Sequence, residues 1–165
     1  MLPNLFLAGF PKAGTTSLFS WLAAHPQVCD ARPKEPGHFL PLRWGDPLPL
    51  LDYTRNFAHA RDERWRFDGT PGYGYGGGAV AEAIREASPD ARVILLLRDP
   101  VGRAFSYYRY RQSQGRLAGV AFGDYVERCL ALPETELGRR ENQDLFGVAG
   151  GCYARWLPEW QAAYG

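Results

Sequence analysis

The chain has 165 residues, of which 45% are hydrophobic and 22% charged, with a formal net charge of +1. These proportions are typical of a globular domain and argue against nucleic-acid or membrane partners recruited by bulk charge. The longest apolar run, Val93 to Leu97, is too short for a membrane span, and no secretory leader is recognised. A cytoplasmic location is therefore expected, with Cys29, Cys129 and Cys152 as free thiols.

The first part of the chain predicts a strand, a helix and a long loop. Residues 4–10 are a short apolar run that ends in Gly-Phe-Pro, as buried strands often do. Residues 15–24 place apolar side chains at helical spacing. The expected buried face of this helix consists of Leu18, Trp21 and Leu22. Five prolines make residues 32–49 a loop.

The middle of the chain predicts a helix, a strand and a second helix. Residues 50–60 are expected to be helical, and residues 64–68 alternate as a strand does. The inward side chains of the first helix would be Leu51, Phe57 and Ala58. Residues 69–78 contain six glycines and are expected to form a mobile loop. In the helix at 79–87, the apolar side consists of Val80, Ala83, Ile84 and Ala87.

The remaining elements complete an alternation of strands and helices. Residues 92–98, RVILLLR, are expected to form a strand, and the continuous apolar run inside it is typical of a parallel strand covered on both faces. Asp99-Pro100 supplies an N-cap and a first-turn proline for a helix to about Gln114. Further helices are expected at 122–132 and 153–163, although Pro158 should break the second.

This order predicts an α/β fold, a three-layer P-loop-like parallel sheet flanked by helices. Three strands make a thin sheet, and the chain stops after a helix with no further strand. Residues 1–165 are therefore interpreted as a single domain that lacks a C-terminal part.

Residues 9–17, GFPKAGTTS, join the first strand to the first helix, where parallel sheets bind ligands. Glycine lets the backbone approach an anion, and a helix start offers unpaired N–H groups. Gly9 and Gly14 have the spacing of a nucleoside-triphosphate loop, but Thr15 follows Gly14 and Lys12 lies inside the loop. The alternative interpretation is an ordinary glycine turn with a solvated lysine.

The stretch PKAGTTSL resembles the 5′-phosphosulfate loop of the sulfotransferase superfamily that uses 3′-phosphoadenosine 5′-phosphosulfate (PAPS). This resemblance implies PAPS as cofactor, 3′,5′-adenosine bisphosphate as its product, and no metal. It gives Lys12 a catalytic role at the bridging oxygen. The cofactor-binding residues that it implies are Lys12, Ala13, Gly14, Thr15, Thr16 and Ser17.

A second anion site is expected where Arg98 ends the strongest strand and Ser106 follows eight residues later. This pair resembles the superfamily's 3′-phosphate motif, in which a guanidinium fork and a hydroxyl bind the phosphate. The alternative is a surface arginine and a helix serine bonded to backbone. Asp99 could instead be the Mg²⁺-holding acid of a kinase, but its place before a proline favours helix capping.

The segment from Lys34 to Phe39, KEPGHF, resembles the acid–base segment of the heparan-type and bacterial branch of the superfamily. The resemblance implies Glu35 as the general base and His38 as the second candidate. Substrate-side residues by the same resemblance are Lys34, Thr70 and Tyr73, and Tyr153 is a further cofactor-binding candidate. The alternative is a solvated proline-rich loop with a surface Glu–Lys pair.

Lys12 and Lys34 are the only lysines among 19 basic residues, and each lies in one of these motifs. The resemblance implies transfer of a sulfuryl group from PAPS to a hydroxyl or amine, with a carbohydrate as the first candidate acceptor. The expected partners are thus a nucleotide and this acceptor, without nucleic acid or membrane. Two alternatives stay open: a P-loop kinase or nucleoside triphosphatase, and a non-catalytic nucleotide-binding remnant.

Overall fold

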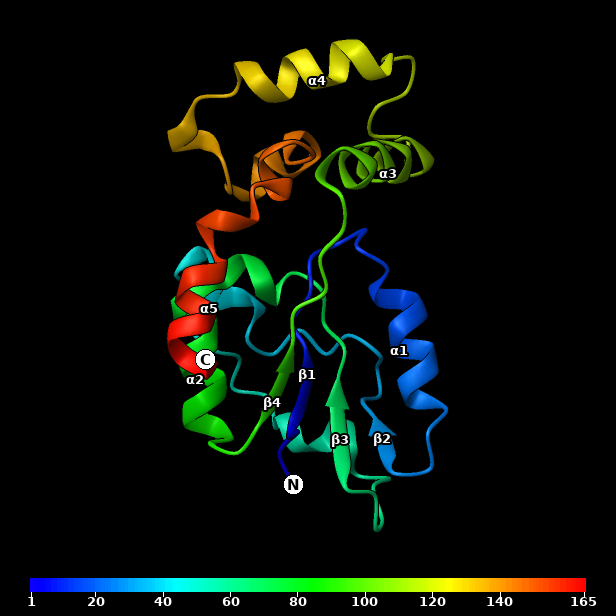
Figure 1. Ribbon diagram of the computed structural model, residues 1–165, viewed down its shortest axis with the longest axis vertical. Coiled ribbons are helices and arrows are strands. Elements are labelled where there is room, and N and C mark those ends of the chain that lie inside the picture. The colour runs from blue at the N-terminus through cyan, green and yellow to red at the C-terminus, as the bar shows by residue number, and fades with distance from the viewer. The chain divides into compact units, whose positions relative to one another are not determined.

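The computed structural model describes residues 1–165, which divide into two compact units (Figure 1). Unit 1 comprises Met1–Leu97 and Arg155–Gly165, and unit 2 comprises Arg98–Ala154. No helix in either unit is long and apolar enough to cross a lipid bilayer.

A four-stranded parallel sheet lies at the centre of unit 1. The strands are β1 (Leu5–Leu7), β2 (Val28–Asp30), β3 (Trp65–Asp68) and β4 (Arg92–Ile94). Their order is β2-β3-β1-β4, and in this register Leu5 pairs with Phe67 on one side and Arg92 on the other. The predicted parallel α/β fold is confirmed. The sheet has one more strand than expected, and the last strand is shorter than the predicted 92–98.

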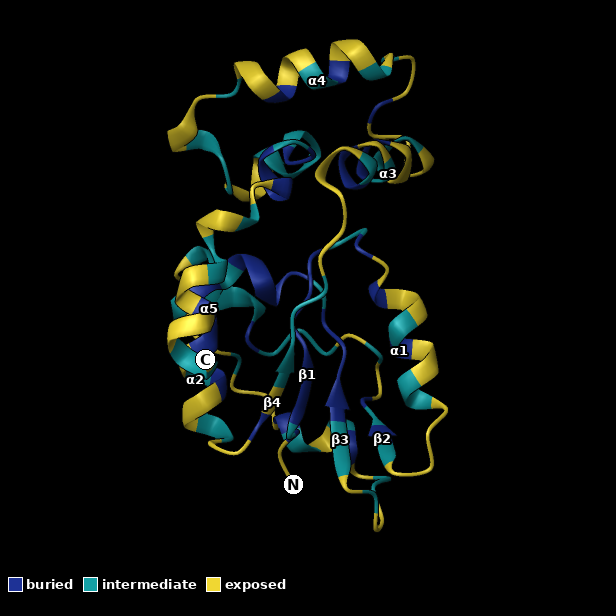
Figure 2. Ribbon diagram, in the orientation of Figure 1, coloured by how far each residue is buried: buried dark blue, intermediate teal, exposed yellow.

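Helices cover both faces of this sheet, because successive strand residues point to opposite sides (Figures 1 and 2). The helices of unit 1 are α1 (Thr15–Ala23), α2 (Gly77–Ala87) and α5 (Leu157–Tyr164). One face packs on α2 and α5 through Phe6, Val80, Ile84 and Trp160. The other face packs on α1 through Leu5, Leu7, Phe19 and Phe67. Val93 and Leu95 join the first cluster and Ile94 and Leu96 the second, so the predicted two-sided cover of this strand is confirmed.

Two predicted buried faces are partly wrong. On α1, Trp21 is 74% exposed, and Phe19 lies inward instead, stacked on Phe67 with ring centroids 5.0 Å apart. The helix expected at 50–60 is only a 3₁₀ turn, Tyr53–Phe57. In that turn Phe57 is buried as expected. Leu51 and Ala58, also expected to be buried, are exposed, and Tyr53 is buried instead.

The glycine-rich segment 69–78 is part of the core, so the prediction of a mobile loop is wrong. It forms a 3₁₀ turn, Tyr73–Gly76, and Tyr73 is completely buried. The Gly72 amide donates a hydrogen bond to the Gly9 carbonyl at 2.9 Å, which ties this segment to the end of β1. The apolar side predicted for α2 is confirmed.

Unit 2 contains α3 (Pro100–Ser113) and α4 (Phe122–Ala131), both close to their predicted bounds. The Asp99 carboxylate accepts a hydrogen bond from the Gly102 amide at 2.5 Å, which confirms its capping role. Tyr108, Leu117, Tyr125 and Cys129 form the core of this unit.

Two remaining sequence expectations concern the C-terminal helix and the cysteines. The helix predicted at 153–163 begins at Leu157, so Pro158 lies in its first turn, where a proline is tolerated. All three cysteines are free, as predicted.

Candidate active site

The loop between β1 and α1 leaves the start of the helix available to an anion. Gly9 lies so close to Thr15 that a Cβ on it would be 2.8 Å from the Thr15 Cγ2 atom. Lys12 and Gly14 both adopt the left-handed backbone conformation, with φ of 73° and 102°. No side chain caps α1, and no acidic residue lies in its first turn. Anions are favoured at such a helix start because its first N–H groups have no intrahelical partners.

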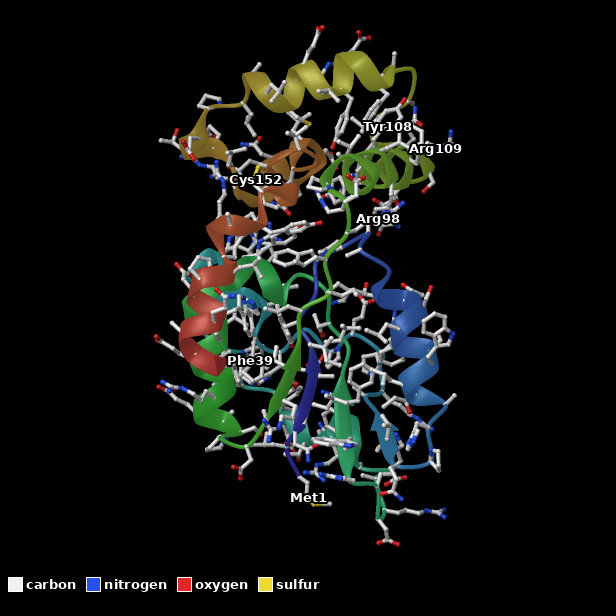
Figure 3. All side chains as sticks on the ribbon, viewed as in Figure 1. Met1, Phe39, Arg98, Tyr108, Arg109 and Cys152 are labelled. Atoms are coloured by element: carbon white, nitrogen blue, oxygen red, sulfur yellow. The ribbon has the colours of Figure 1, made fainter.

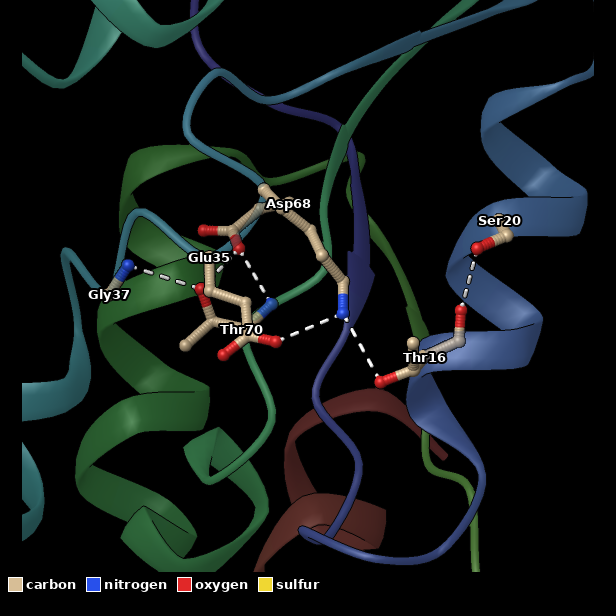
Figure 4. Close-up of polar contacts among 7 residues, drawn as sticks. Thr16, Ser20, Glu35, Gly37, Asp68 and Thr70 are labelled. Atoms are coloured by element: carbon tan, nitrogen blue, oxygen red, sulfur yellow. Dashed lines mark hydrogen bonds and ion pairs between the residues drawn. The ribbon is translucent and has the colours of Figure 1, made fainter. Parts of the chain in front are cut away.

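The predicted acid–base segment contacts the first turn of α1 (Figure 4). The Lys34 ammonium lies 3.1 Å from the Glu35 carboxylate and 3.4 Å from the Thr16 hydroxyl. It also lies over the Phe19 ring, 5.1 Å from the centroid. The Glu–Lys pair of the alternative interpretation exists, and half-exposed pairs of this kind add little stability. The structure nevertheless brings Lys34, and through it Glu35, next to the first turn of α1, and the predicted roles of both residues stay predictions.

Asp68, at the carboxyl end of β3, is a fully buried carboxylate that sequence analysis missed. The Thr70 amide and hydroxyl donate to its Oδ1 atom at 2.9 and 2.6 Å (Figure 4). The Tyr73 hydroxyl donates to its Oδ2 atom at 3.0 Å, and the Tyr53 hydroxyl donates to the same atom. Burial raises the pKa of Asp68, while the hydrogen bonds from Thr70, Tyr53 and Tyr73 oppose that rise. Burial and the Asp68 charge raise the pKa values of both tyrosines.

His38, Thr70 and Tyr73 pack within this network. The His38 ring stacks on Tyr53 with centroids 4.2 Å apart and an interplanar angle of 5°, and partial burial lowers its pKa. A neutral imidazole can accept a proton, so His38 as an alternative base stays a prediction. Thr70 and Tyr73 are buried against Asp68. Their predicted contact with substrate also stays a prediction.

The second predicted anion site lies in unit 2. Figure 3 shows Arg98 at the start of α3, and the arginine is exposed. The Tyr153 hydroxyl donates to the Arg98 carbonyl at 2.9 Å and accepts from its amide at 3.4 Å. The structure therefore gives Tyr153 a contact with the Arg98 backbone, and its predicted contact with the nucleotide is untested. Ser106 is partly exposed, and its hydroxyl makes no bond to backbone of the kind that Ser113 makes at 2.8 Å.

The match to a known family distinguishes the superfamily suggested by the sequence motifs from a kinase or nucleoside triphosphatase. A family model described as "Sulfotransferase domain" matches residues 2–135. The chain belongs to the sulfotransferase family. Carbohydrate sulfotransferase 15 of Homo sapiens is similar, with 29% identity over 81% of this chain and 31% of the relative. A bifunctional heparan sulfate N-deacetylase/N-sulfotransferase of Drosophila melanogaster is 23% identical over 99% of this chain and 17% of its own length.

The fold supports the same family. The crystal structure of a sulfotransferase from Alicyclobacillus acidocaldarius superposes with a TM-score of 0.81 and 25% identity. This match covers 100% of the present chain and 70% of that protein. The superfamily inferred from the phosphate-loop and Arg–Ser motifs is thereby confirmed, and nothing supports a kinase or triphosphatase. The chain spans about a third or less of the curated sulfotransferases that it matches.

Proposed function

We propose that the chain transfers a sulfuryl group from PAPS to a hydroxyl or amine of a carbohydrate. One observation carries the proposal: the Lys34–Glu35 pair touches the Thr16 hydroxyl at the uncapped start of α1. A proton acceptor and an anion-binding helix start are thus neighbours, as transfer from a phosphosulfate to a hydroxyl requires. The names of the two carbohydrate-modifying relatives support the acceptor class. The expected cytoplasmic location stays a prediction.

The phosphate loop fits the 5′-phosphosulfate. The uncapped helix start, the hydroxyls of residues 15–17 and the Lys12 ammonium offer donors to a group that carries several anionic oxygens. When bound, PAPS supplies a sulfuryl group on an activated phosphosulfate anhydride. Lys12 would stabilise the negative charge that grows on the bridging oxygen, as preorganised electrostatics do in other transferases.

Arg98 and Ser106 are the proposed ligands of the 3′-phosphate. The guanidinium presents a planar fork to phosphate oxygens, and a hydroxyl that has no backbone partner can add one directed bond.

Glu35 is the proposed base. Its carboxylate takes the proton of the acceptor hydroxyl while the acceptor oxygen bonds to sulfur and the bond from sulfur to the bridging oxygen breaks. The Lys34 ammonium, 3.1 Å away, keeps this carboxylate next to α1. A positioned base contributes ~10²–10⁴ to the rate.

The test is a calorimetric titration of 3′,5′-adenosine bisphosphate against the wild type, Lys12→Ala and Arg98→Ala, followed by assays of transfer from PAPS to desulfated heparin and chondroitin. Arg98→Ala should weaken binding by ~1.5–3 kcal/mol, the range for a charged hydrogen bond. Arg109→Ala is the matched control, because Arg109 is an exposed arginine on α3, the helix that follows Arg98, and this variant should bind normally. Unchanged affinity in Arg98→Ala removes the 3′-phosphate assignment. Binding without transfer to any acceptor would identify a non-catalytic remnant.

A further inference from the structure

The loop that carries Glu35 is attached to β3 through one buried carboxylate, Asp68. Three side chains donate hydroxyl hydrogen bonds to Asp68: Thr70, Tyr73 and Tyr53. Each of the three also contacts the segment Gly37–Phe39, which begins two residues after Glu35. The contacts of Asp68 therefore extend to three consecutive residues of the acid–base loop.

Two of these connections run from a backbone amide through a hydroxyl to the carboxylate. The Gly37 amide donates to the Thr70 hydroxyl at 3.1 Å, and this hydroxyl donates to Asp68 Oδ1 at 2.6 Å (Figure 4). The Phe39 amide donates to the Tyr73 hydroxyl at 3.3 Å, which donates to Asp68 Oδ2 at 3.0 Å. A carboxylate only accepts, so it orients each hydroxyl with its lone pairs toward the loop amide.

The third connection fixes the side chain between these two amides. Tyr53 donates to Asp68, and the Tyr53 ring carries the stacked His38 imidazole at 4.2 Å. The same tyrosine ring meets Phe39 edge-on, with centroids 5.5 Å apart. Through these contacts Asp68 is connected to His38 as well as to the backbone on either side of it.

Packing alone does not explain why an acidic residue, Asp68, is buried at the end of β3. Asp68 is completely buried, and its four hydrogen bonds all come from neutral groups. Removing a carboxylate from water is costly, and an apolar residue at the same position would avoid that cost. What the carboxylate adds is an acceptor that can take four bonds at once, three from side chains on two segments and one from the Thr70 amide.

We propose that Asp68 is a positioning residue for the acid–base loop: through Thr70, Tyr73 and Tyr53 it fixes residues 37–39 and so the direction of Glu35. This inference rests on the proposed function. By positioning Glu35, Asp68 affects proton transfer from the acceptor. It does not affect nucleotide binding, which is the role of the loop between β1 and α1. Loss of the network should therefore lower kcat and leave nucleotide affinity intact.

The first test is Tyr73→Phe, which keeps the ring and removes the hydroxyl between Phe39 and Asp68. The expected result is a fall in kcat for transfer from PAPS to desulfated heparin of about 10- to 100-fold, because small displacements of a catalytic group are costly. The dissociation constant of 3′,5′-adenosine bisphosphate should not change. Tyr125→Phe is the matched control, since it removes a hydroxyl that donates to the Asp144 carbonyl in unit 2, and it should keep the wild-type kcat.

The second test does not need activity. The chain has three histidines, so the imidazole proton resonances of His38 can be followed by NMR beside those of His25 and His59. Valine has nearly the shape of threonine but lacks the hydroxyl. Thr70→Val should therefore shift the His38 resonances and leave those of His25 and His59 in place. Thr70→Ser keeps the hydroxyl and should leave them near their wild-type positions.

Two results would overturn the proposal: His38 resonances that stay in place in both Tyr73→Phe and Thr70→Val, or a kcat that falls only together with nucleotide affinity. If the wild type transfers no sulfuryl group, the proposed function fails. The resonance comparison then still decides whether Asp68 holds the loop.

Discussion

Replacing Gly9 with alanine adds a methyl group where the phosphate loop meets the start of α1. The new Cβ would lie 2.8 Å from Thr15 Cγ2 and 3.4 Å from Leu96 Cβ. Carbon atoms pack favourably at ~3.5–4.0 Å, so the Thr15 contact must open by roughly 1 Å. Thr15 is buried and β-branched in the first turn of a helix, which restricts its escape to another rotamer.

The expected cost is that of overpacking a well-filled site, ~1–3 kcal/mol. For a chain of this size, about 2 kcal/mol lowers the melting temperature by about 4–8 °C. Thermal and urea unfolding measure the change in stability. Calorimetry with 3′,5′-adenosine bisphosphate measures the accompanying loss of affinity, which is expected because the displaced Thr15 is a proposed ligand of the nucleotide.

A second substitution, at Thr15, should relieve the clash. Thr15→Ser removes Cγ2 and keeps the hydroxyl, so in the Gly9→Ala background it should return most of the lost stability, as a double-mutant cycle would measure. Gly123→Ala is the control, because a Cβ at this helix position has no neighbour within 4 Å. A Gly9→Ala melting temperature equal to that of the wild type, or a Thr15→Ser substitution that restores no stability, would contradict the predicted clash.

Three further outcomes are expected. Glu35→Gln should lower kcat ~10²–10⁴-fold with unchanged nucleotide affinity, and a normal kcat would exclude Glu35 as the base. Because burial raises the pKa of Asp68 above 3.8, the folded chain keeps a proton that the unfolded chain releases. The free energy of unfolding should therefore fall as pH rises from about 4 through the native pKa of Asp68, and urea titrations at several pH values should show this fall disappear in Asp68→Asn. Tyr153→Phe removes both hydrogen bonds to the Arg98 backbone and should lower the affinity for 3′,5′-adenosine bisphosphate about 5-fold, as measured by calorimetry. An affinity equal to that of the wild type would show that this contact is dispensable.

Features that depend on neighbouring residues in the sequence could be predicted. The Asp99 cap, the helix after it and the strand–glycine–helix order of residues 4–24 all follow from local patterns. These patterns also carried the resemblance that the family match confirms. Local physics is sufficient where a residue and its partner lie within one or two turns.

Features that depend on distant partners could not be predicted. Strand β2 has three residues, too few for a periodic pattern, and it is defined by its pairing with β3. Helical spacing alone gave α1 a buried face with Trp21, because the ring that selects Phe19 belongs to Phe67. The contacts of Asp68 come from Tyr53, 15 residues earlier, and from residues after β3. A lone acidic residue at the end of strand RWRFD was the available signal, and it was not used.

The prediction of a mobile loop at residues 69–78 is wrong for a related reason. Glycine can give a backbone conformational freedom, but in this segment its missing side chain lets the backbone pack closely against the core. A Cβ on Gly74 would lie 2.8 Å from the Ala8 carbonyl, and one on Gly69 would collide with the Phe19 ring. Close packing of backbone against a core requires the same residue type as a loose turn, and the sequence pattern does not separate the two cases.

The acid–base loop and the phosphate loop are connected to different strands. The acid–base loop is hydrogen-bonded to β3 through Asp68, and the phosphate loop directly follows β1. Residues 45–52 lie between two residues of the Asp68 network, Phe39 and Tyr53, and expose Leu50 and Leu51 to solvent. This span can lengthen, shorten or change composition without altering the attachment of either loop to its strand, since surface loops between fixed ends tolerate such variation. Under the proposed function, this span can therefore change during evolution while the attachment of Glu35's loop to β3 and the phosphate loop after β1 are both kept.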